Sequence, residues 1–459
     1  MDKLKAKHQL KVAIIGSGPS GFYVADALIN ADIPVEITLL EKLPCPYGLI
    51  RYGVAPDHQK LKRIANTLDV IAEHPSVTFL GNVELGKDIS LEELNLLYQV
   101  IVFCNGMPDS MSLGIEGEEL TGVYPCNDLI GWYNGHPYYQ NQEFNFDHDT
   151  AVVIGHGNVA IDIARILSKS IDELRESDIP EPALEVLSNK TLKHVHMVGR
   201  RGPVQSKFTT KELHELGKLS HCNVSLDPKY LDLKAACQQE LDDTANIIVQ
   251  KNYKVLQSYA NNFSEVHDKN KTQIKIDFML NPKYFSGKKQ LSSAFFEETY
   301  LEGTAFKQTC QSLDSVIEIP CGLAFTSVGF RGAILEDLAV TEPKRTLTNQ
   351  HSKLLGSDGK IFEGLYAAGW IKRGPQGVIG TNRECAQDTV DNIVKDAPAL
   401  LQKSAEGEAG LLKILNIKNI RYTTFEDWKV IDEKEVEKGK TLGKPREKFI
   451  TVDAMLACL

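Results

Sequence analysis

Six residues near the start of the chain have the types and spacing of a loop that holds a dinucleotide. The segment from Gly16 to Gly21 reads G-S-G-P-S-G and directly follows an apolar, largely β-branched run over residues 11–15. A helical pattern over residues 22–31 comes next. In such a strand–loop–helix unit the first glycine permits a tight turn, the second lets a pyrophosphate approach, and the third allows close helix packing. Gly16, Gly18 and Gly21 are therefore predicted to hold a dinucleotide phosphate at a helix N-terminus.

An acidic residue follows this loop at the distance that a ribose partner requires. Residues 35–40 read as a second strand, and Glu41 stands at its end. A carboxylate about 20 residues beyond such a loop accepts hydrogen bonds from ribose hydroxyls. The alternative interpretation is a glycine-rich turn followed by a surface glutamate. The strand, glycines, helix, second strand and acid occur in the expected order, which favours the nucleotide site.

A second glycine loop begins after a strand over residues 151–154, and the strand that follows it does not end in an acid. It reads G-H-G-N-V-A, the variant with alanine in third place, and its predicted contacts are Gly157, Asn158, Val159 and Ala160. The following strand, at 194–198, ends in Gly199-Arg200-Arg201 and not in an acid. An acid would repel a 2′-phosphate, whereas arginines donate charge-assisted bonds to it. The pattern predicts an NADP(H) site, although a solvated basic turn is the alternative.

Two nucleotide sites in one chain indicate hydride chemistry between a mobile nicotinamide and a resident flavin. Such transfer needs no acid–base triad, because the protein mainly orients the two rings. The glycine-rich segment 369–380 precedes a helix that starts near Asn382. Its backbone amides suit a flavin phosphate or the O2/N1 edge of the ring. A plain strand–loop–helix connection is the alternative.

Three apolar runs predict how the chain is divided. Residues 100–106, 317–325 and 364–369 read as strands that return to a nucleotide-binding sheet. The fold class is therefore α/β with two Rossmann-like domains, the second inserted in a discontinuous first domain. The predicted FAD-binding domain comprises residues 1–107 and 321–459, and the predicted NADP-binding domain comprises 108–320. The charged region 426–446 is expected to be a surface extension.

Composition excludes several other classes. The 459 residues carry a formal charge of −10 and are 42% apolar, which argues against a dedicated nucleic-acid binder. No apolar run is long enough to span a bilayer, and the polar start at Met1 offers no signal peptide, so a cytoplasmic location is expected. No two of the nine cysteines form a C-x-x-C pair, so neither an iron–sulfur cluster nor a dithiol relay is expected.

Several longer segments resemble the adrenodoxin reductase family of ferredoxin–NADP reductases. They are residues 46–58, 155–165, 369–379 and the C-terminal G-K-P-R-E-K at 443–448. The resemblance covers nearly the whole chain and implies a glutathione-reductase-like arrangement with FAD and NADP(H) as cofactors. It is least clear at 170–190 and 260–290.

The resemblance also implies particular contact residues. FAD contacts would be Ser20, Glu41, Leu49, Val83, Trp370, Gly377, Val378 and Ile379. NADP contacts would be Gly157, Asn158, Val159, Ala160, Arg200, Arg201, Glu212 and Gly377. Many members have alanine where this chain has Ser20, and Trp370 replaces the acid that disulfide reductases usually carry. His58 and Asp162 match positions linked to electron or proton transfer, although structural roles are the alternative.

The pattern leaves three functions open. The leading prediction is electron transfer from NADPH through FAD to a small iron–sulfur ferredoxin. A two-electron flavoprotein reductase is one alternative, but the chain lacks a C-x-x-C relay and an N-terminal cysteine cluster. A non-catalytic redox sensor that binds both nucleotides is the other.

Charge patterning predicts where an acidic ferredoxin docks. Residues 191–218 carry a formal charge of +4, and residues 171–188 carry −5. Opposite fields orient a charged partner, so Lys193, Lys207 and Lys218 are predicted to form a docking patch. The alternative is that Arg200 and Arg201 serve only NADP and the other charges are solvated.

Overall fold

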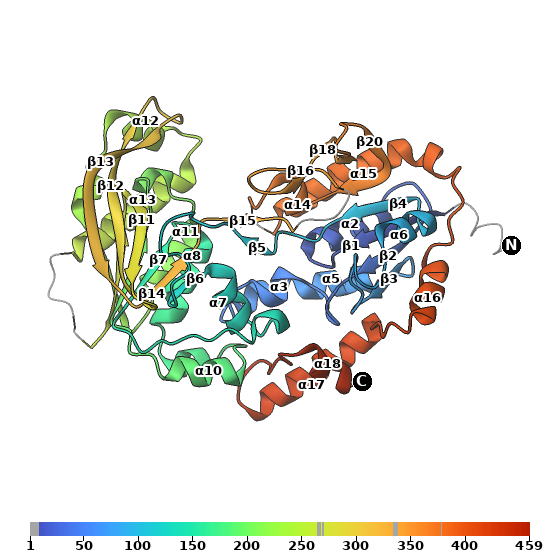
Figure 1. Cartoon of the computed structure of the whole chain (residues 1–459), viewed down its shortest axis with the longest axis horizontal. Helices are drawn as coiled ribbons and strands as arrows, with labels where there is room; N and C mark the ends of the chain where they lie inside the picture. Colours follow the sequence, from blue (N-terminus) through green and yellow to red (C-terminus); the bar gives the residue numbers. More distant parts are fainter. Residues whose placement is uncertain (1–8, 264–267, 269, 334–337, 378) are drawn as a thin grey trace. The chain divides into compact units, whose positions relative to one another are not determined.

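The computed structural model describes residues 9–263, 268, 270–333, 338–377 and 379–459. The chain forms two compact units. Unit 1 comprises Met1–Asp109, Asn134–Gln140 and Gly329–Leu459, and unit 2 comprises Ser110–Tyr133 and Asn141–Val328. Figure 1 shows unit 1 in blue and in orange to red, and unit 2 mainly in green and yellow.

Unit 1 is built on a seven-stranded sheet within the described residues, in the order β18-β19-β20-β4-β1-β2-β3. Strands β20, β4, β1, β2 and β3 run parallel, whereas β18, β19 and β20 pair antiparallel. Their apolar runs are buried on both faces, as parallel sheets require. The strands are β1 (Leu10–Ile15), β2 (Val35–Leu40), β3 (Val77–Leu80), β4 (Val100–Phe103), β18 (Asn349–Gln350), β19 (Lys353–Leu355) and β20 (Ile361–Ala367).

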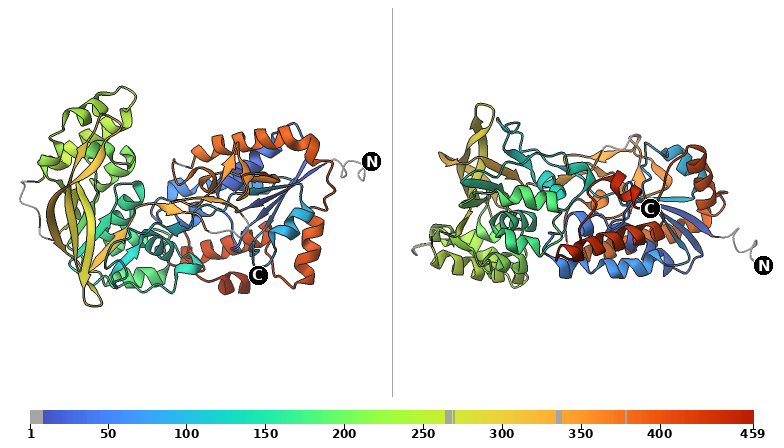
Figure 2. Two further views of the ribbon diagram at one scale, coloured as in Figure 1. Left: turned by 45° about the horizontal axis from the view of Figure 1, so that its top comes forward. Right: turned by 90° about the horizontal axis from the view of Figure 1, so that it is seen from below.

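Helices cover both faces of this sheet (Figure 2). Val12 and Ile14 of β1 share one core with residues of α2, α5, α15, α17 and α18. Ala13 and Ile15 point to the other face and share a core with α6 and α16. The helices are α2 (Pro19–Ile29), α3 (Leu49–Tyr52), α4 (Gln59–Lys62), α5 (Ala65–Ala72), α6 (Leu91–Leu97), η2 (Pro137–Tyr139), α14 (Trp370–Arg373), α15 (Thr381–Leu400), α16 (Glu408–Ile417), α17 (Phe425–Thr441) and α18 (Val452–Ala457).

Unit 2 contains a six-stranded parallel sheet, in the order β6-β14-β7-β8-β10-β9 among the described residues. A three-stranded antiparallel sheet, β11-β12-β13, shares a core with it through side chains such as Phe296 and Val152. The strands are β6 (Val123–Pro125), β7 (Thr150–Ile154), β8 (His194–Val198), β9 (Cys222–Leu226), β10 (Thr272–Asp277), β11 (Leu280–Gly287), β12 (Leu291–Glu302), β13 (Thr309–Pro320) and β14 (Leu323–Thr326).

The helices of unit 2 connect its parallel strands. Helix α8 packs on β7 and β8, and α11 packs on α8. The helices are α7 (Cys126–Tyr133), α8 (Asn158–Ser168), α9 (Ile171–Arg175), α10 (Glu181–Ser188), η3 (Pro203–Gln205), α11 (Thr210–Leu216), η4 (Pro228–Leu231), α12 (Ala235–Asp242) and α13 (Ile247–Asn261). The short strands elsewhere are β5 (Asp109–Ser110), β15 (Phe330–Arg331), β16 (Val340–Thr341) and β17 (Thr346–Leu347).

The predicted returning strands are placed correctly in two of three cases. Residues 100–106 and 364–369 contain β4 and the end of β20, which pair in the sheet of unit 1. The prediction for 317–325 is wrong, because β14 pairs with β7 in the sheet of unit 2. The chain therefore returns to unit 1 after Val328 and not at residue 321. An apolar run shows that a strand is buried but does not show which sheet buries it.

The region 426–446 is not a surface extension. It forms most of α17, in which Trp428, Ile431 and Glu435 are buried. The Glu435 carboxylate accepts a hydrogen bond from Arg51 Nη2 at 2.6 Å. Lys448 Nζ donates one to the Arg51 carbonyl oxygen at 3.2 Å. Because Arg51 lies in α3, these buried charges hold the C-terminal segment to the stretch that follows the first nucleotide loop.

Candidate nucleotide-binding sites

Each glycine of the first loop meets a different spatial requirement. Gly16 has φ +103°, and a Cβ there would lie 2.7 Å from the Cys104 carbonyl oxygen. A Cβ at Gly21 would lie 2.0 Å from the Gly16 carbonyl oxygen, so α2 packs directly on the loop. A Cβ at Gly18 would meet no atom within 4 Å. The loop therefore has two closely packed glycines and one that faces open space, where a ligand can approach the backbone.

The Glu41 carboxylate lies against this loop. Its Oε2 accepts hydrogen bonds from Ser17 N at 3.1 Å and Ser17 Oγ at 2.9 Å, and its Oε1 accepts one from Leu43 N at 3.2 Å. A carboxylate has about four acceptor positions, so capacity remains for a ribose hydroxyl. Ser17 was not among the predicted contacts, and its position between two glycines is the only sequence signal for its role.

The segment that follows Pro46 covers the loop. Tyr47 N donates to the Ser17 carbonyl oxygen at 2.9 Å, and a Cβ at Gly48 would lie 3.1 Å from the Gly18 Cα. Leu49 is 49% exposed, so its side chain is available to a ligand. Val83 is only 2% exposed and packs in the core. A contact through Val83 would thus involve its backbone.

Asn382 links three segments around the same loop. Its Oδ1 accepts from Ser20 Oγ at 3.1 Å and from Arg373 Nη2 at 2.9 Å, and its Nδ2 donates to the Ile379 carbonyl oxygen at 3.2 Å. Neither Asn382 nor Arg373 was predicted as a site residue. The role of Asn382 depends on its contact with Ser20, 362 residues away in the sequence, which spacing alone cannot reveal.

The remaining predicted residues of this segment lie beside α14 and α15. Trp370 stacks on Phe330 with ring centroids 5.6 Å apart. Gly377 has φ +83°, and a Cβ there would lie 2.6 Å from Thr381 Oγ1. Val378 lies outside the described residues. The loop is thus held close to the first residue of α15.

These features of unit 1 fit a bound dinucleotide. No side chain among the described residues caps the N-terminus of α2, so backbone N–H groups remain available there for an anion. Asn105 Oδ1 and Arg373 Nε are buried and have no partner within the described part of the chain. Asn105 also lies next to the loop, because a Cβ at Gly16 would be 2.9 Å from the Asn105 Cα. Buried polar groups are normally satisfied, so both atoms fit a ligand contact.

The second loop repeats the packing of the first. Gly155 has φ +139°, and its Cβ would lie 2.3 Å from the Ser327 carbonyl oxygen. Ala160 is completely buried. A Cβ at Gly157 would meet no atom within 4 Å, and no side chain caps the N-terminus of α8. Asn158 and Val159 form the first turn of this helix, so they lie where a phosphate would bind.

His156 fixes the middle of the second loop. Its Nε2 donates to the Met197 carbonyl oxygen at 3.1 Å, and its ring centroid lies 4.4 Å from that of Phe278. A Cβ at Gly199 would lie 2.3 Å from His156 Nδ1, so only glycine fits there. Burial lowers the pKa of His156 to about 4, although the Met197 carbonyl and Asp277 oppose that shift. The imidazole is therefore neutral near neutral pH.

Arg200 and Arg201 follow the carboxyl end of β8 and are exposed. Within the described residues, neither guanidinium makes an ion pair with an acid. Glu212 lies in the first turn of α11, and its Oε2 accepts the Thr209 hydroxyl. The arginines are therefore free to meet an anion, while Glu212 is held by its neighbour.

His58 and Asp162 occupy different units. His58 immediately precedes α4 and is half-buried. Asp162 lies on α8 and accepts from Arg165 Nη2 at 3.0 Å. These placements do not test a role in electron or proton transfer, which stays a prediction.

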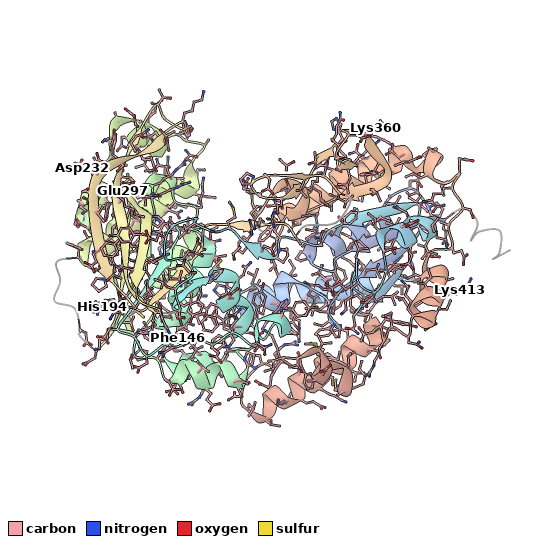
Figure 3. All side chains as sticks on the ribbon, viewed as in Figure 1. Phe146, His194, Asp232, Glu297, Lys360 and Lys413 are labelled. Atoms are coloured by element: carbon pink, nitrogen blue, oxygen red, sulfur yellow. The ribbon has the colours of Figure 1, made fainter. Side chains whose placement is uncertain are left out.

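The three predicted docking lysines do not share one face of unit 2. Lys193 precedes β8 and Lys218 precedes β9, so both lie at the amino edge of the parallel sheet. Lys207 follows the carboxyl end of β8. The five-residue strand separates the two edges by about 15 Å, at about 3.3 Å per residue. In Figure 3 His194, the first residue of β8, and Asp232, which follows η4, are labelled at separate places in unit 2.

Metal-binding clusters and membrane-spanning helices are both absent from the described residues. No group of His, Cys, Asp or Glu side chains there is arranged to hold a metal ion. No helix in the same residues is both long and apolar enough to cross a membrane.

Comparison with known proteins places the chain in a family, although no family model matches it. It is 35% identical to the mitochondrial NADPH:adrenodoxin oxidoreductase of Arabidopsis thaliana, over 98% of this chain and 95% of that protein. It is also 35% identical to NADPH-ferredoxin reductase FprA of Mycobacterium tuberculosis, over 97% of this chain and 98% of that protein.

Solved structures agree with this placement. The structure of Mycobacterium tuberculosis FprA in complex with NADPH matches with a TM-score of 0.89 and 34% identity, over 98% of this chain and 99% of that chain. A histidine-to-glutamine variant of FprA gives a TM-score of 0.91. The predicted α/β fold class and the resemblance are therefore confirmed. The chain belongs to the family of NADPH-dependent adrenodoxin and ferredoxin reductases, and it is an oxidoreductase.

Proposed function

We propose that this protein transfers electrons from NADPH through FAD to a ferredoxin-type iron–sulfur protein. The observation that carries the proposal is a pair of glycine loops with the same packing and opposite charged partners. The first loop has Glu41 beside it, and the second is followed by Arg200 and Arg201. An acid suits unmodified ribose hydroxyls and two arginines suit a 2′-phosphate, so one chain is equipped for two different dinucleotides.

Unit 1 is the proposed FAD-binding domain. Gly16, Gly18 and Gly21 shape the loop, the N-terminus of α2 receives the pyrophosphate, and Glu41 accepts the ribose hydroxyls. Contacts from Ser20, Leu49, Val83, Trp370 and residues 377–379 complete the proposed site. Bound FAD supplies the exchange between the two electrons of a nicotinamide and the single electrons of an iron–sulfur cluster.

Unit 2 is the proposed NADP-binding domain. Gly157, Asn158, Val159 and Ala160 present the backbone of the loop and the first turn of α8. Arg200 and Arg201 bind the 2′-phosphate, and Glu212 accepts a hydroxyl group. Gly377 of the unit 1 loop is proposed to contact both nucleotides. His58 and Asp162 keep their proposed part in electron or proton transfer, and the cytoplasmic location stays a prediction.

Two of the three predicted lysines remain in the proposed docking surface for ferredoxin. Lys193 and Lys218 lie at the same edge of the sheet, whereas Lys207 lies at the other. Lys193 is paired with Asp149 at 3.0 Å, and no acid within the described residues pairs with Lys218. An acidic partner would therefore be attracted mainly by Lys218.

The test uses the full chain and three electron acceptors. The purified protein should be yellow, release FAD on denaturation, and oxidise NADPH with ferricyanide. Reduction of cytochrome c should require an added ferredoxin. Ferricyanide turnover without any ferredoxin-dependent reduction would favour a two-electron reductase. Binding of both nucleotides without turnover would favour a redox sensor.

A further inference from the structure

The segment Ser206–Thr209 runs across the N-terminus of α8. Lys207 N donates to the His156 carbonyl oxygen at 2.8 Å, and Thr209 N donates to Asn158 Oδ1 at 2.7 Å. His156 is the middle residue of the second glycine loop, and Asn158 is the first residue of α8. The segment therefore borders the backbone groups that are proposed to hold a pyrophosphate.

Local geometry directs the Lys207 side chain to the open side. Ser206 and Thr209 have extended backbone angles, and successive side chains of an extended segment point to opposite sides. Phe208 is 2% exposed, and its ring centroid lies 6.2 Å from that of His156. The neighbouring Lys207 is exposed. Phe208 thus anchors the segment, and Lys207 faces away from the core.

Among the described residues, no acid compensates the charge on Lys207. Lys193 is paired with Asp149, and Lys211 lies within 4.0 Å of Glu212 and Glu215. Lys207 has no such acid among the residues that the structure describes. Its four-carbon stem lets the ammonium group reach about 6 Å from the backbone. That reach covers the open space beside Gly157, where a Cβ would meet no atom within 4 Å.

We propose that Lys207 binds the pyrophosphate of NADP(H), in addition to the backbone groups of the loop. The proposal deepens the assignment of unit 2 and rests on the proposed function. A lysine acts on phosphate as a mobile point charge, whereas the paired arginines suit the forked bonds of a terminal phosphate. Arg200 and Arg201 should therefore distinguish NADPH from NADH, and Lys207 should not, because both nucleotides carry the pyrophosphate.

The experiment compares Lys207→Gln, Lys207→Glu and Lys207→Arg in the full-length holoprotein. Dissociation constants for NADP⁺ and NAD⁺ are measured by flavin difference absorbance, and the affinity for 2′-AMP, which has no pyrophosphate, is measured by competition. Lys254→Gln, which removes an exposed lysine of α13, is the matched control. A KM for each nicotinamide nucleotide with ferricyanide excludes any contribution from ferredoxin.

Lys207→Gln should raise the dissociation constants of NADP⁺ and NAD⁺ by the same factor. The expected factor is about threefold to tenfold for one exposed charge-assisted contact. Lys207→Glu should raise both dissociation constants further, and Lys207→Arg should return both to the values of the unmodified protein. The affinity for 2′-AMP should change little in all three variants.

Three results would overturn the proposal. A loss of affinity for NADP⁺ and 2′-AMP, with unchanged affinity for NAD⁺, would place Lys207 at the 2′-phosphate. Unchanged nucleotide constants together with a changed KM for ferredoxin, measured by cytochrome c reduction, would place Lys207 in the docking surface. Equal constants in Lys207→Gln and Lys254→Gln would mean that Lys207 contacts no nucleotide. Failure of the proposed function is distinguishable, because the unmodified protein would then lack NADPH turnover or ferredoxin-dependent reduction, whatever the Lys207 variants do to nucleotide affinity.

Discussion

The two glycine loops share one backbone design and differ in the residue between the first two glycines. In unit 1 that residue is Ser17, whose N–H and hydroxyl both bond to Glu41. In unit 2 it is His156, which bonds to the Met197 carbonyl oxygen. Ser17 thus joins the loop to a carboxylate at the end of the second strand. His156 joins its loop to the backbone of β8, and the residues after that strand are exposed arginines.

The surroundings of the two loops also differ. The first loop is bordered within its own unit by Tyr47 and Gly48 and by the bonds of Asn382. The second has exposed cations at the carboxyl edge of its sheet, and no acid in the described part of the chain pairs with them. A nucleotide enclosed by several segments leaves slowly, whereas one held mainly by exposed charges exchanges readily and is sensitive to salt. The difference matches a resident FAD and a mobile NADP(H).

Replacing Arg200 and Arg201 together should produce the largest effect. The double variant Arg200→Gln with Arg201→Gln removes the charge-assisted bonds to the 2′-phosphate, each worth about 1.5–3 kcal/mol when desolvated. The KM for NADPH should rise by about 100-fold, and the KM for NADH should change only a few-fold. Steady-state ferricyanide assays with both nucleotides measure the ratio. An unchanged ratio would show that the 2′-phosphate is recognised by other residues.

Glu41→Ala should weaken FAD retention by removing the ribose bonds. The expected loss is about 1.5–3 kcal/mol, or roughly tenfold to 100-fold in the dissociation constant. Flavin fluorescence during dialysis or apoprotein titration measures it. Glu41→Gln keeps an acceptor for Ser17. Its affinity for FAD should therefore lie between those of Glu41→Ala and the parent protein. Full occupancy and unchanged affinity in Glu41→Ala would contradict the assignment of the first loop.

The sequence was sufficient to predict both loops, because each depends on residues that are consecutive in the chain. It also predicted the strands β4 and β20, whose apolar runs are buried in the sheet of unit 1. It could not predict the role of Asn382, because its partner Ser20 lies 362 residues away in the sequence, although Arg373 and Ile379 are close to Asn382 along the chain.

Charge patterns were the least reliable guide. The charged C-terminal region was expected at the surface, yet Glu435 is completely buried and pairs with Arg51. The positive segment 191–218 was expected to form one patch, yet a strand divides it between two edges of the sheet. The composition of a segment gives its net charge, whereas pairing and strand direction determine where that charge lies.

The histidine of the second loop should make unit 2 sensitive to acid. Below about pH 6.5 the unfolded chain binds a proton at this residue, whereas the folded protein does so only near pH 4. The free energy of unfolding should therefore fall as pH decreases between these values, by at most about 1.4 kcal/mol per pH unit. His156→Gln keeps a donor for the Met197 carbonyl oxygen but cannot titrate.

Thermal melting at pH 7 and pH 5 provides the measurement. The decrease in Tm between these two values should be smaller in His156→Gln than in the parent protein. Lys254→Gln, which changes an exposed residue of α13, should show the same decrease as the parent. An identical decrease in all three proteins would mean that His156 does not couple folding to pH.

The smallest effect should come from the lysines at the amino edge of unit 2. Lys218→Glu should lower the rate of ferredoxin-dependent cytochrome c reduction at low salt by about threefold, because a reversed exposed charge changes steering more than stability. Lys193→Glu should have less effect, since Asp149 already compensates Lys193 at 3.0 Å. The screening length falls from about 10 Å at 0.1 M salt to about 3 Å at 1 M, so the parent and both variants should converge at high salt. Ferricyanide reduction by the same proteins is the control, because a small acceptor needs no docking surface. Equal ferredoxin turnover in the parent and both variants at low salt would show that this edge is not where ferredoxin binds.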